Sequence, residues 1–170
     1  MIKYVKGNIL NATEGYICHS VNHQGVLGSG LAKQLADIYP DLKNSNGQYM
    51  QMCKTLSYEL IKHNGHIAFC GTGKGHQTIV CIFGQEYYGR DKQYTDYVAL
   101  GNGFDSLRIM IQDFIDRDVI FPLGTSIAIP SGSGKECFYQ MDRINLACPE
   151  LGISVFEFLT KSKMYFPPED

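Results

Sequence analysis

Residues 17 to 34 read ICHSVNHQGVLGSGLAKQ, and this stretch constrains the fold more tightly than any other part of the chain. An apolar run that begins at Tyr16 meets a cluster of polar side chains, and three glycines follow before a helical pattern opens at Leu31. Glycines between a strand and a helix let backbone N–H groups approach an anion, and the helix dipole favours the negative charge. The stretch therefore predicts a strand–loop–helix unit that binds a phosphorylated small molecule.

Composition excludes several classes of protein. The 170 residues are 44% hydrophobic, which suits one domain with a substantial core. A net charge of −2 gives no argument for nucleic acid or an anionic membrane as the main partner. The six cysteines show no zinc spacing, the first residues lack the apolar run of a secretory signal, and no stretch is as long as a membrane span. We expect a reduced, cytoplasmic protein that holds no metal.

Strand and helix patterns alternate along the chain. Apolar or alternating runs predict strands at 2–5, 16–21, 59–62, 66–70, 78–83, 126–130 and 153–159, with a hairpin turn at 64–65. Helical periodicity predicts helices at 31–39, 49–54, 94–116 and 138–146. This order favours an α/β fold, with a largely parallel central sheet and helices on both faces. We expect a single domain over residues 1–160, followed by a polar tail at 161–170.

A second glycine-rich segment, IPSGSGK at 129–135, also follows a predicted buried strand. It resembles half of a P-loop, but the full pattern needs a glycine five residues before the GK pair and Ser or Thr after it. Here Gly124 lies ten residues before Gly134, and Glu136 follows Lys135, so an NTPase is not expected. A backbone nest for a phosphate and a plain turn both remain open. Because ligands of such sheets bind beyond the carboxyl ends of strands, the two glycine-rich segments should meet at one ligand.

Several motifs together resemble the macrodomain family. They are YVKGNIL at 4–10, HSVNHQGVLGSGLAKQL at 19–35, YP at 39–40, FGQ at 83–85 and YTDYVAL at 94–100. The likeness is closest to the small macrodomain phosphatases that process ADP-ribose 1″-phosphate, and it weakens after residue 130. It implies a three-layer macrodomain fold, in which a mixed and mostly parallel sheet has helices on both faces. It also implies ADP-ribose or a derivative as ligand, no cofactor, and nucleic acid only as an ADP-ribosylated substrate.

The resemblance also assigns roles to residues. Asn8 and Ile9 take the adenine site, and Asn22 contacts the distal ribose. His19 falls where the phosphatase subfamily has its catalytic histidine, and His23 is a second catalytic candidate, because imidazole titrates near pH ~6.5. Two loops would hold the diphosphate and ribose. Their ligand-binding residues are Gly25, Val26, Leu27, Gly28, Ser29, Gly30 and Leu31 in the first loop and Ser131, Gly132, Ser133, Gly134 and Lys135 in the second.

The chain departs from the family pattern at three places. Asn8 stands where most macrodomains have Asp, and the second loop continues as KECFY rather than with glycine and tryptophan. The lysine of one class of ADP-ribosyl-hydrolase macrodomains would fall near Gln85, so that mechanism is not expected. None of the acidic residues matches a catalytic acid of the family. The acidic residues considered are Asp105, Asp116, Asp118 and Glu136.

Three functions remain open at this point. The chain is a phosphatase of ADP-ribose 1″-phosphate, or it releases ADP-ribose from a protein, a nucleic acid or an acetyl ester, or it captures ADP-ribose without turnover. All three use the same pocket, and they differ in whether His19 is needed for turnover. The aromatic residues whose roles stay open are Phe156 and Phe158 as alternatives for stacking on adenine, and Tyr87, Tyr88 and Phe138 as a cover over the ligand or as core.

Overall fold

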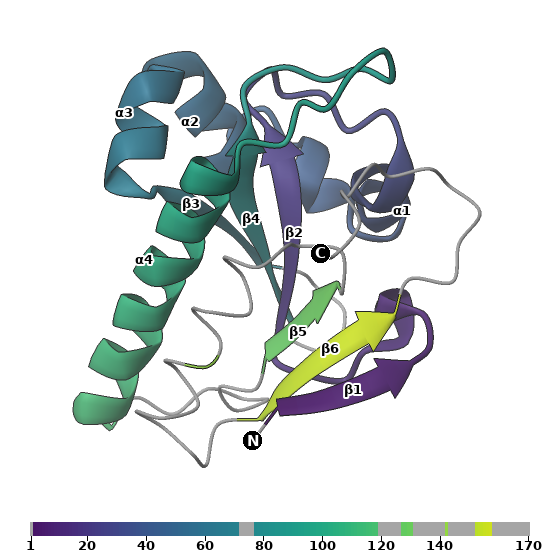
Figure 1. Ribbon diagram of the computed structural model, residues 1–170, viewed down its shortest axis with the longest axis vertical. Coiled ribbons are helices and arrows are strands. Elements are labelled where there is room, and N and C mark those ends of the chain that lie inside the picture. Colours follow the sequence, from purple (N-terminus) through teal and green to yellow (C-terminus); the bar gives the residue numbers. More distant parts are fainter. Residues whose placement is uncertain (1, 72–76, 119–126, 131–141, 143–151, 158–170) are drawn as a thin grey trace.

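The computed structural model describes residues 2–71, 77–118, 127–130, 142 and 152–157 (Figure 1). Within them, six strands form one sheet in the order β1-β6-β5-β2-β4-β3. The strands are β1 Ile2–Lys6, β2 Tyr16–Asn22, β3 Ile67–Gly71, β4 Thr78–Gln85, β5 Ile127–Pro130 and β6 Ile153–Glu157. Neighbouring strands pair in parallel, except that β3 pairs antiparallel with β4. The predicted mixed, mostly parallel sheet is thus confirmed.

Helices cover both faces of this sheet. They are the 3-10 helices η1 Ile9–Asn11 and η2 Pro40–Lys43, and the α-helices α1 Gly30–Ile38, α2 Gln48–Thr55, α3 Tyr58–Asn64 and α4 Tyr97–Asp116. Helix α4 runs along one side of the sheet, and α1 lies on the other side (Figure 1). None of the described helices is both long and apolar enough to cross a membrane.

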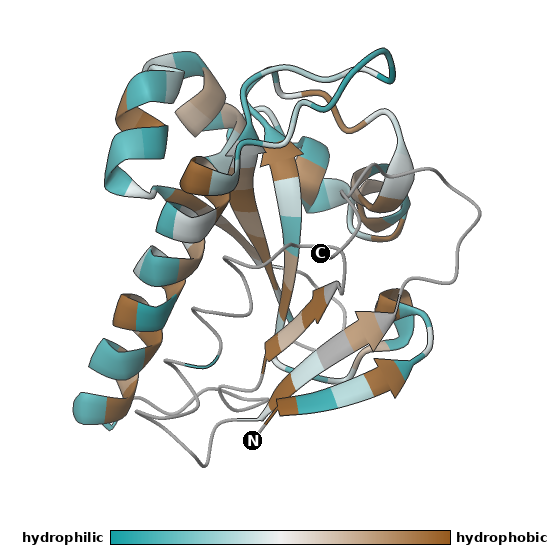
Figure 2. Cartoon of the chain, in the orientation of Figure 1, coloured by the Kyte–Doolittle hydropathy of each residue, from teal (hydrophilic) through white to brown (hydrophobic). Residues whose placement is uncertain are grey.

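Two hydrophobic clusters fill the spaces between these layers, because successive side chains of a strand point to opposite faces. On the face of α1 and α2, Ile17 and Phe83 pack with Leu35 of α1. On the face of α4, Val80 and Ile82 pack with residues of that helix. Figure 2 shows the hydrophobic colouring of β5 and of the middle of β4, where residues 79–83 are all apolar. The α4 residues in the second cluster are Leu100, Phe104, Leu107 and Ile111.

One predicted strand is wrong: residues 59–62 belong to helix α3, and residues 64–65 form no hairpin turn. The Ser57 hydroxyl accepts a bond of 3.3 Å from the N–H of Leu60 at the start of the helix. Gly65 ends the helix in the left-handed region at φ 64°. A Cβ at Gly65 would collide with the Asn102 carbonyl, so glycine also permits the close approach of α3 to α4.

Strand β4 contains one extra residue near its carboxyl end. Val21 pairs with Phe83 but Asn22 pairs with Gln85, so Gly84 forms a bulge. A Cβ at Gly84 would collide with the Ser20 hydroxyl, which explains the need for glycine. The bulge places Gln85 opposite Asn22, where the first glycine-rich loop begins.

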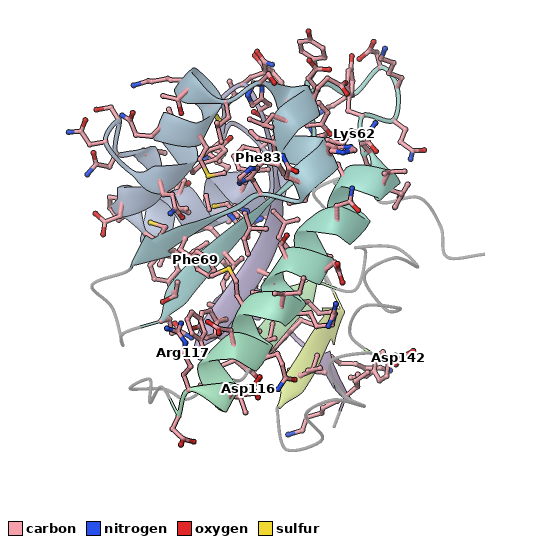
Figure 3. All side chains as sticks on the ribbon, turned by 90° about the vertical axis from the view of Figure 1, so that its left-hand side faces the viewer. Lys62, Phe69, Phe83, Asp116, Arg117 and Asp142 are labelled. Carbon is pink, nitrogen blue, oxygen red and sulfur yellow. The ribbon has the colours of Figure 1, made fainter. Side chains whose placement is uncertain are left out.

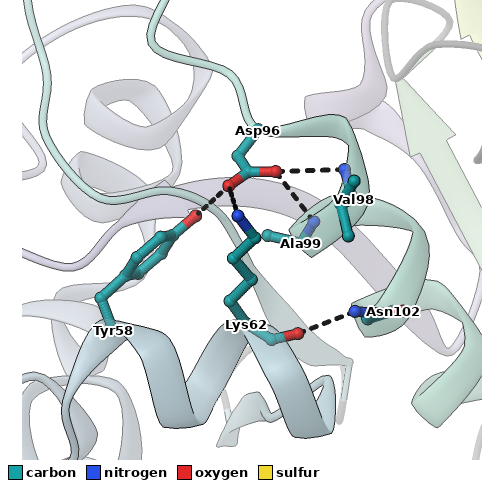
Figure 4. A network of polar contacts seen from close by, with 6 residues as sticks. All are labelled: Tyr58, Lys62, Asp96, Val98, Ala99 and Asn102. Atoms are coloured by element: carbon teal, nitrogen blue, oxygen red, sulfur yellow. Dashed lines mark hydrogen bonds and ion pairs between the residues drawn. The ribbon is translucent and has the colours of Figure 1, made fainter.

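A polar network fixes the start of α4 (Figure 4). Asp96 accepts bonds from the N–H groups of Val98 (3.1 Å) and Ala99 (3.2 Å), and its other oxygen pairs with the Lys62 ammonium at 2.9 Å. Tyr58 donates its hydroxyl hydrogen to the same carboxylate at 3.4 Å. Burial opposes the charge, but Lys62 and the helix amides outweigh it and lower the pKa of Asp96. Helix α4 therefore begins three residues later than predicted, next to α3.

Candidate functional site

Five of the strands run parallel, so their carboxyl ends meet at one edge of the sheet. Asn8 follows β1 at one side of this edge, and Asn22 ends β2, separated from β1 by β6 and β5. The predicted phosphate loop at 131–135 follows β5 directly in sequence, but it lies outside the described residues, as does the predicted helix at 138–146. The described part of the edge thus has η1 on one side, beyond β1, and the first loop and the end of β4 on the other side.

Asn22 organises the first loop through its side chain. Its Oδ1 accepts bonds from the N–H groups of Gln24 (2.9 Å) and Val26 (3.2 Å), and its Nδ2 donates to the Val26 carbonyl at 2.7 Å. These partners fix which end of the amide is oxygen and which is nitrogen. Nδ2 carries a second hydrogen, which can serve a ligand hydroxyl.

Glycines let the loop turn into α1. Gly25 has φ 73° and Gly30 has φ 61°, both in the left-handed region that glycine enters without strain. A Cβ at Gly25 would lie 3.1 Å from the Met50 methyl group. Ser29 precedes the nine-residue helix α1, and its side chain makes no capping bond to the first turn. A helix N-terminus without a side-chain cap is a place that suits an anion such as a phosphate.

The structure separates the predicted ligand residues into two groups. Val26 and Leu27 are half-buried, and Gly28 and Ser29 are exposed. The side chains of Ile9 and Leu31 are 0% exposed and belong to the core, so only their backbone can contact a ligand. Asn8 caps η1, since its Oδ1 accepts a 3.0 Å bond from the N–H of Leu10, and this leaves the Nδ2 hydrogens as donors.

His19 lies inside the protein. Its side chain is 2% exposed, its Nε2 lies 3.3 Å from the Cys81 sulfur, and its Nδ1 has no hydrogen-bond partner within the described residues. Burial lowers the pKa of His19 from 6.5 to about 4, so the imidazole is uncharged at neutral pH. The catalytic role of His19 stays a prediction.

His23, the other catalytic candidate, stands at the start of the loop. Its Nε2 lies 2.7 Å from the Leu56 carbonyl oxygen. Because a carbonyl oxygen can only accept, Nε2 carries the hydrogen, and Nδ1 of the uncharged ring is an acceptor. The ring packs near Tyr58 and Phe83, with centroids 5.9 Å and 6.4 Å away. Figure 3 shows Phe83 at the same end of the molecule as Lys62, opposite the end where Asp116 and Arg117 close α4.

A pocket of about 400 Å³ opens beside His23, and we call it the α2 pocket. Its lining residues come from the first loop, α2 and the segment that follows β4, and they are His23, Gln24, Gly25, Met50, Cys53, Lys54, Glu86 and Tyr87. Sequence reasoning assigned His23 and Gly25 to the site but missed the residues of α2 and Glu86, because no local motif marks them. Among the described residues, no group of three His, Cys, Asp or Glu side chains could hold a metal ion.

The sequence matches no family model and no curated protein. Solved structures do resemble the chain. The macrodomain of Mycobacterium tuberculosis DarG superposes with a TM-score of 0.69 at 19% identity, covering 93% of this chain and 98% of that one. The macrodomain of Thermus aquaticus DarG gives 0.64 at 22% identity, covering 94% and 99%.

A third structure, Thermosipho africanus DarTG in complex with ADP-ribose, has a TM-score of 0.62 at 16% identity and covers 93% of this chain and 42% of that one. At these identities the likeness establishes the fold, which is the three-layer macrodomain fold that the sequence predicts. It does not extend to the phosphatase subfamily, because these matches are DarG macrodomains.

Proposed function

We propose that this chain, which has the macrodomain fold, binds ADP-ribose and hydrolyses the bond between the distal ribose and the group attached to it. The observation that carries the proposal is the loop that Asn22 organises, which runs into the first turn of α1, where the Ser29 side chain makes no capping bond. Such a turn suits a diphosphate, and the Asn22 amide suits a ribose hydroxyl. The ADP-ribose complex of Thermosipho africanus DarTG, which shares the fold, supports the same ligand class.

The ligand would lie along the carboxyl edge of the sheet. We place the adenine beside Asn8, the diphosphate between the first loop and residues 131–135, and the distal ribose beside Asn22. Strands β6 and β5 lie between β1 and β2, so in this placement ADP-ribose extends across four neighbouring strands. Phe156 belongs to the core, and Phe158 lies outside the described residues, so neither is assigned to the adenine.

Hydrolysis at the distal ribose needs a base that can orient a water molecule. The sequence assigns catalysis to His19 and His23, and of these two His23 lines the pocket next to Asn22. The Nδ1 atom of His23 is an acceptor, and its ring is held by the Leu56 carbonyl. We therefore propose His23 as the base. For the departing group, the resemblance favours a terminal phosphate, and an ester or a protein side chain is the alternative.

The test is calorimetric titration with ADP-ribose, run beside assays of phosphate release from ADP-ribose 1″-phosphate and ADP-ribose release from ADP-ribosylated protein. Asn22→Ala should weaken ADP-ribose binding about tenfold or more, the effect of losing one or two hydrogen bonds. Asn46→Ala, at an exposed turn, is the matched control. Binding without any turnover would make the chain a capture module, and absence of binding would overturn the proposal.

A further inference from the structure

We infer that Tyr87 forms a subsite for the distal ribose, in which the tyrosine ring packs on the sugar in the α2 pocket. The inference rests on the proposed function, because it takes the position of ADP-ribose from it. It goes further by naming a residue that selects ligands with a second ribose over ligands that end at the diphosphate.

The place of Tyr87 along the sheet edge follows from the strand order. In the proposed placement the adenine lies beside β1 and the distal ribose beside β2, and β4 is the next strand beyond β2. Gln85, the last residue of β4, pairs with Asn22. His23 and Gly25 follow Asn22 in the first loop, and they line the α2 pocket together with Tyr87. The distal ribose is therefore the part of ADP-ribose that lies nearest to Tyr87.

Hydrogen bonds hold the segment that carries Tyr87 against the first loop. The Glu86 carbonyl accepts bonds from the N–H of His23 and from Nε2 of Gln24, both at 3.1 Å. Nε2 of Gln85 donates to the Tyr87 carbonyl at 2.7 Å. Because these bonds already fix the backbone of the segment beside the first loop, a ligand that binds here spends little free energy on ordering it.

The side chain of Tyr87, by contrast, is left over from folding. It is 55% exposed, and within the described residues its hydroxyl makes no hydrogen bond. Tyr88 is 54% exposed but does not line the α2 pocket, and Phe138 lies outside the described residues. Of the three aromatic residues that the sequence offers as a cover over the ligand, Tyr87 is therefore the one that lies at the pocket.

A tyrosine ring suits a ribose in two ways. The ring is a flat apolar surface on which the C–H groups of a sugar can pack, so that both surfaces lose contact with water. The hydroxyl can donate a hydrogen bond to a ribose hydroxyl or accept one from it. Neither contact depends on charge, and the pocket lining contains both the Lys54 ammonium and the Glu86 carboxylate. The assignment of an uncharged sugar to this pocket thus rests on Tyr87 and not on the sign of a charge.

The experiment compares ADP-ribose with ADP, which keeps the adenine and the diphosphate but lacks the distal ribose. Calorimetry gives the Kd of each ligand for the unaltered protein, Tyr87→Ala and Tyr87→Phe. Tyr88→Ala is the matched control, because it removes a similarly exposed ring from the neighbouring position. We expect Tyr87→Ala to weaken ADP-ribose about tenfold, the effect of losing one aromatic contact, and to leave ADP unchanged. Tyr87→Phe keeps the ring and should weaken ADP-ribose about threefold or less.

A second measurement detects the contact without any substitution. Hydroxyl radicals modify exposed aromatic rings, and a bound ligand protects the rings that it covers. In the unaltered protein, ADP-ribose should reduce the labelling of Tyr87 and leave the labelling of Tyr88 unchanged. ADP should protect neither ring.

The outcomes separate the subsite from the proposed function. If the unaltered protein binds ADP-ribose but Tyr87→Ala and Tyr88→Ala bind it equally well, the subsite is wrong and the proposed function stands. The same holds if Tyr87→Ala weakens ADP as much as ADP-ribose, or if bound ADP-ribose leaves the labelling of Tyr87 unchanged. If ADP-ribose itself does not bind, the proposed function fails and the subsite falls with it.

Discussion

The hydroxyl of Tyr49 on α2 donates a 2.9 Å hydrogen bond to the backbone carbonyl of Asn22 at the end of β2. A weaker contact of 3.4 Å joins the same hydroxyl to the Asn22 side-chain oxygen. Burial raises the pKa of Tyr49, so the hydroxyl keeps its hydrogen at neutral pH. One buried bond thus connects helix α2 to the residue that shapes the first loop.

Replacing Tyr49 with Phe should loosen this connection. The ring keeps its packing on Phe83 at 5.6 Å, and only the donor is lost. We expect the free energy of unfolding to fall by about 1 kcal/mol, and the Kd for ADP-ribose to rise several-fold because Asn22 is held less firmly. Urea unfolding and calorimetry measure the two effects. Tyr94→Phe removes an exposed bond to Asp91 and is the control; equal effects of both variants on binding would contradict the prediction.

Gly65 should tolerate no side chain. Its φ of 64° and the nearby Asn102 carbonyl both oppose a Cβ, and Gly65→Ala should lower the free energy of unfolding by about 2 kcal/mol or more. Gly71→Ala is the control, because a Cβ there meets no atom within 4 Å. Urea denaturation of both variants gives the comparison. A Gly65→Ala protein as stable as Gly71→Ala would show that α3 and α4 can separate without cost.

Stability should fall in mild acid because of His19. The pKa of His19 is about 4 in the folded protein and near 6.5 when unfolded, so the unfolded chain binds more protons between these values. The contribution is complete above pH ~6.5 and is lost as the pH falls toward 4, with a size of about 3 kcal/mol. The free energy of unfolding, measured across this pH range, should depend less steeply on pH in His19→Gln than in the exposed control His63→Gln. Parallel curves would refute the assignment to His19.

The same His19→Gln variant tests the predicted catalytic role. Because the ring is buried and His23 lines the α2 pocket, we expect turnover to persist in His19→Gln and to fall at least about a hundredfold in His23→Gln, the usual loss of a general base. Turnover of a substrate established for the unaltered protein is the measurement, with ADP-ribose binding as the check on folding. The reverse order of the two variants would assign catalysis to His19.

Asp96 should contribute to stability in two separable ways. Asp96→Asn keeps an acceptor for the helix amides of Val98 and Ala99 but loses the ion pair with Lys62, whereas Asp96→Ala loses both. We expect losses of roughly 0.5 and 1–2 kcal/mol, respectively. Since the pKa of Asp96 is lowered, its contribution is present at neutral pH and disappears as the carboxylate is protonated in acid. Asp113→Asn, at an exposed pair with Arg117, is the control for thermal unfolding, and equal losses in all three variants would argue against the cap.

The sequence predicts those elements of the fold whose signals lie within one short stretch of chain. The strand–loop–helix unit from Tyr16 to Ile38 and the buried strand β4 carry their own periodicity and glycine signals. The sequence of helix α3 predicts a strand instead, because its seven residues show little helical periodicity and its ends depend on Ser57 and Gly65 as caps. An Asn-Gly pair is read more readily as a hairpin than as the end of a helix.

The candidate site was predictable only in its first loop. The burial of His19 depends on β4 and the core around it, which lie far away in sequence. The walls of the α2 pocket come from residues near 50 and near 86, and only the strand order brings them beside His23. No spacing rule in the chain connects these segments.

Because of the bulge at Gly84, the side chains that reach this edge of the sheet depend on the exact number of residues in strand β4. Side chains along a strand alternate with a period of two, so a shift by one residue exchanges the faces of everything that follows. Gly84 is the extra residue of the bulge, so the side chains before it and after it do not follow one continuous alternation between the two faces of the sheet. Deleting Gly84 would restore a regular ladder and move Gln85 and Glu86 one place along it. A single-residue insertion or deletion in this strand would thus change the character of the edge more than most substitutions could, although it would leave the composition almost untouched.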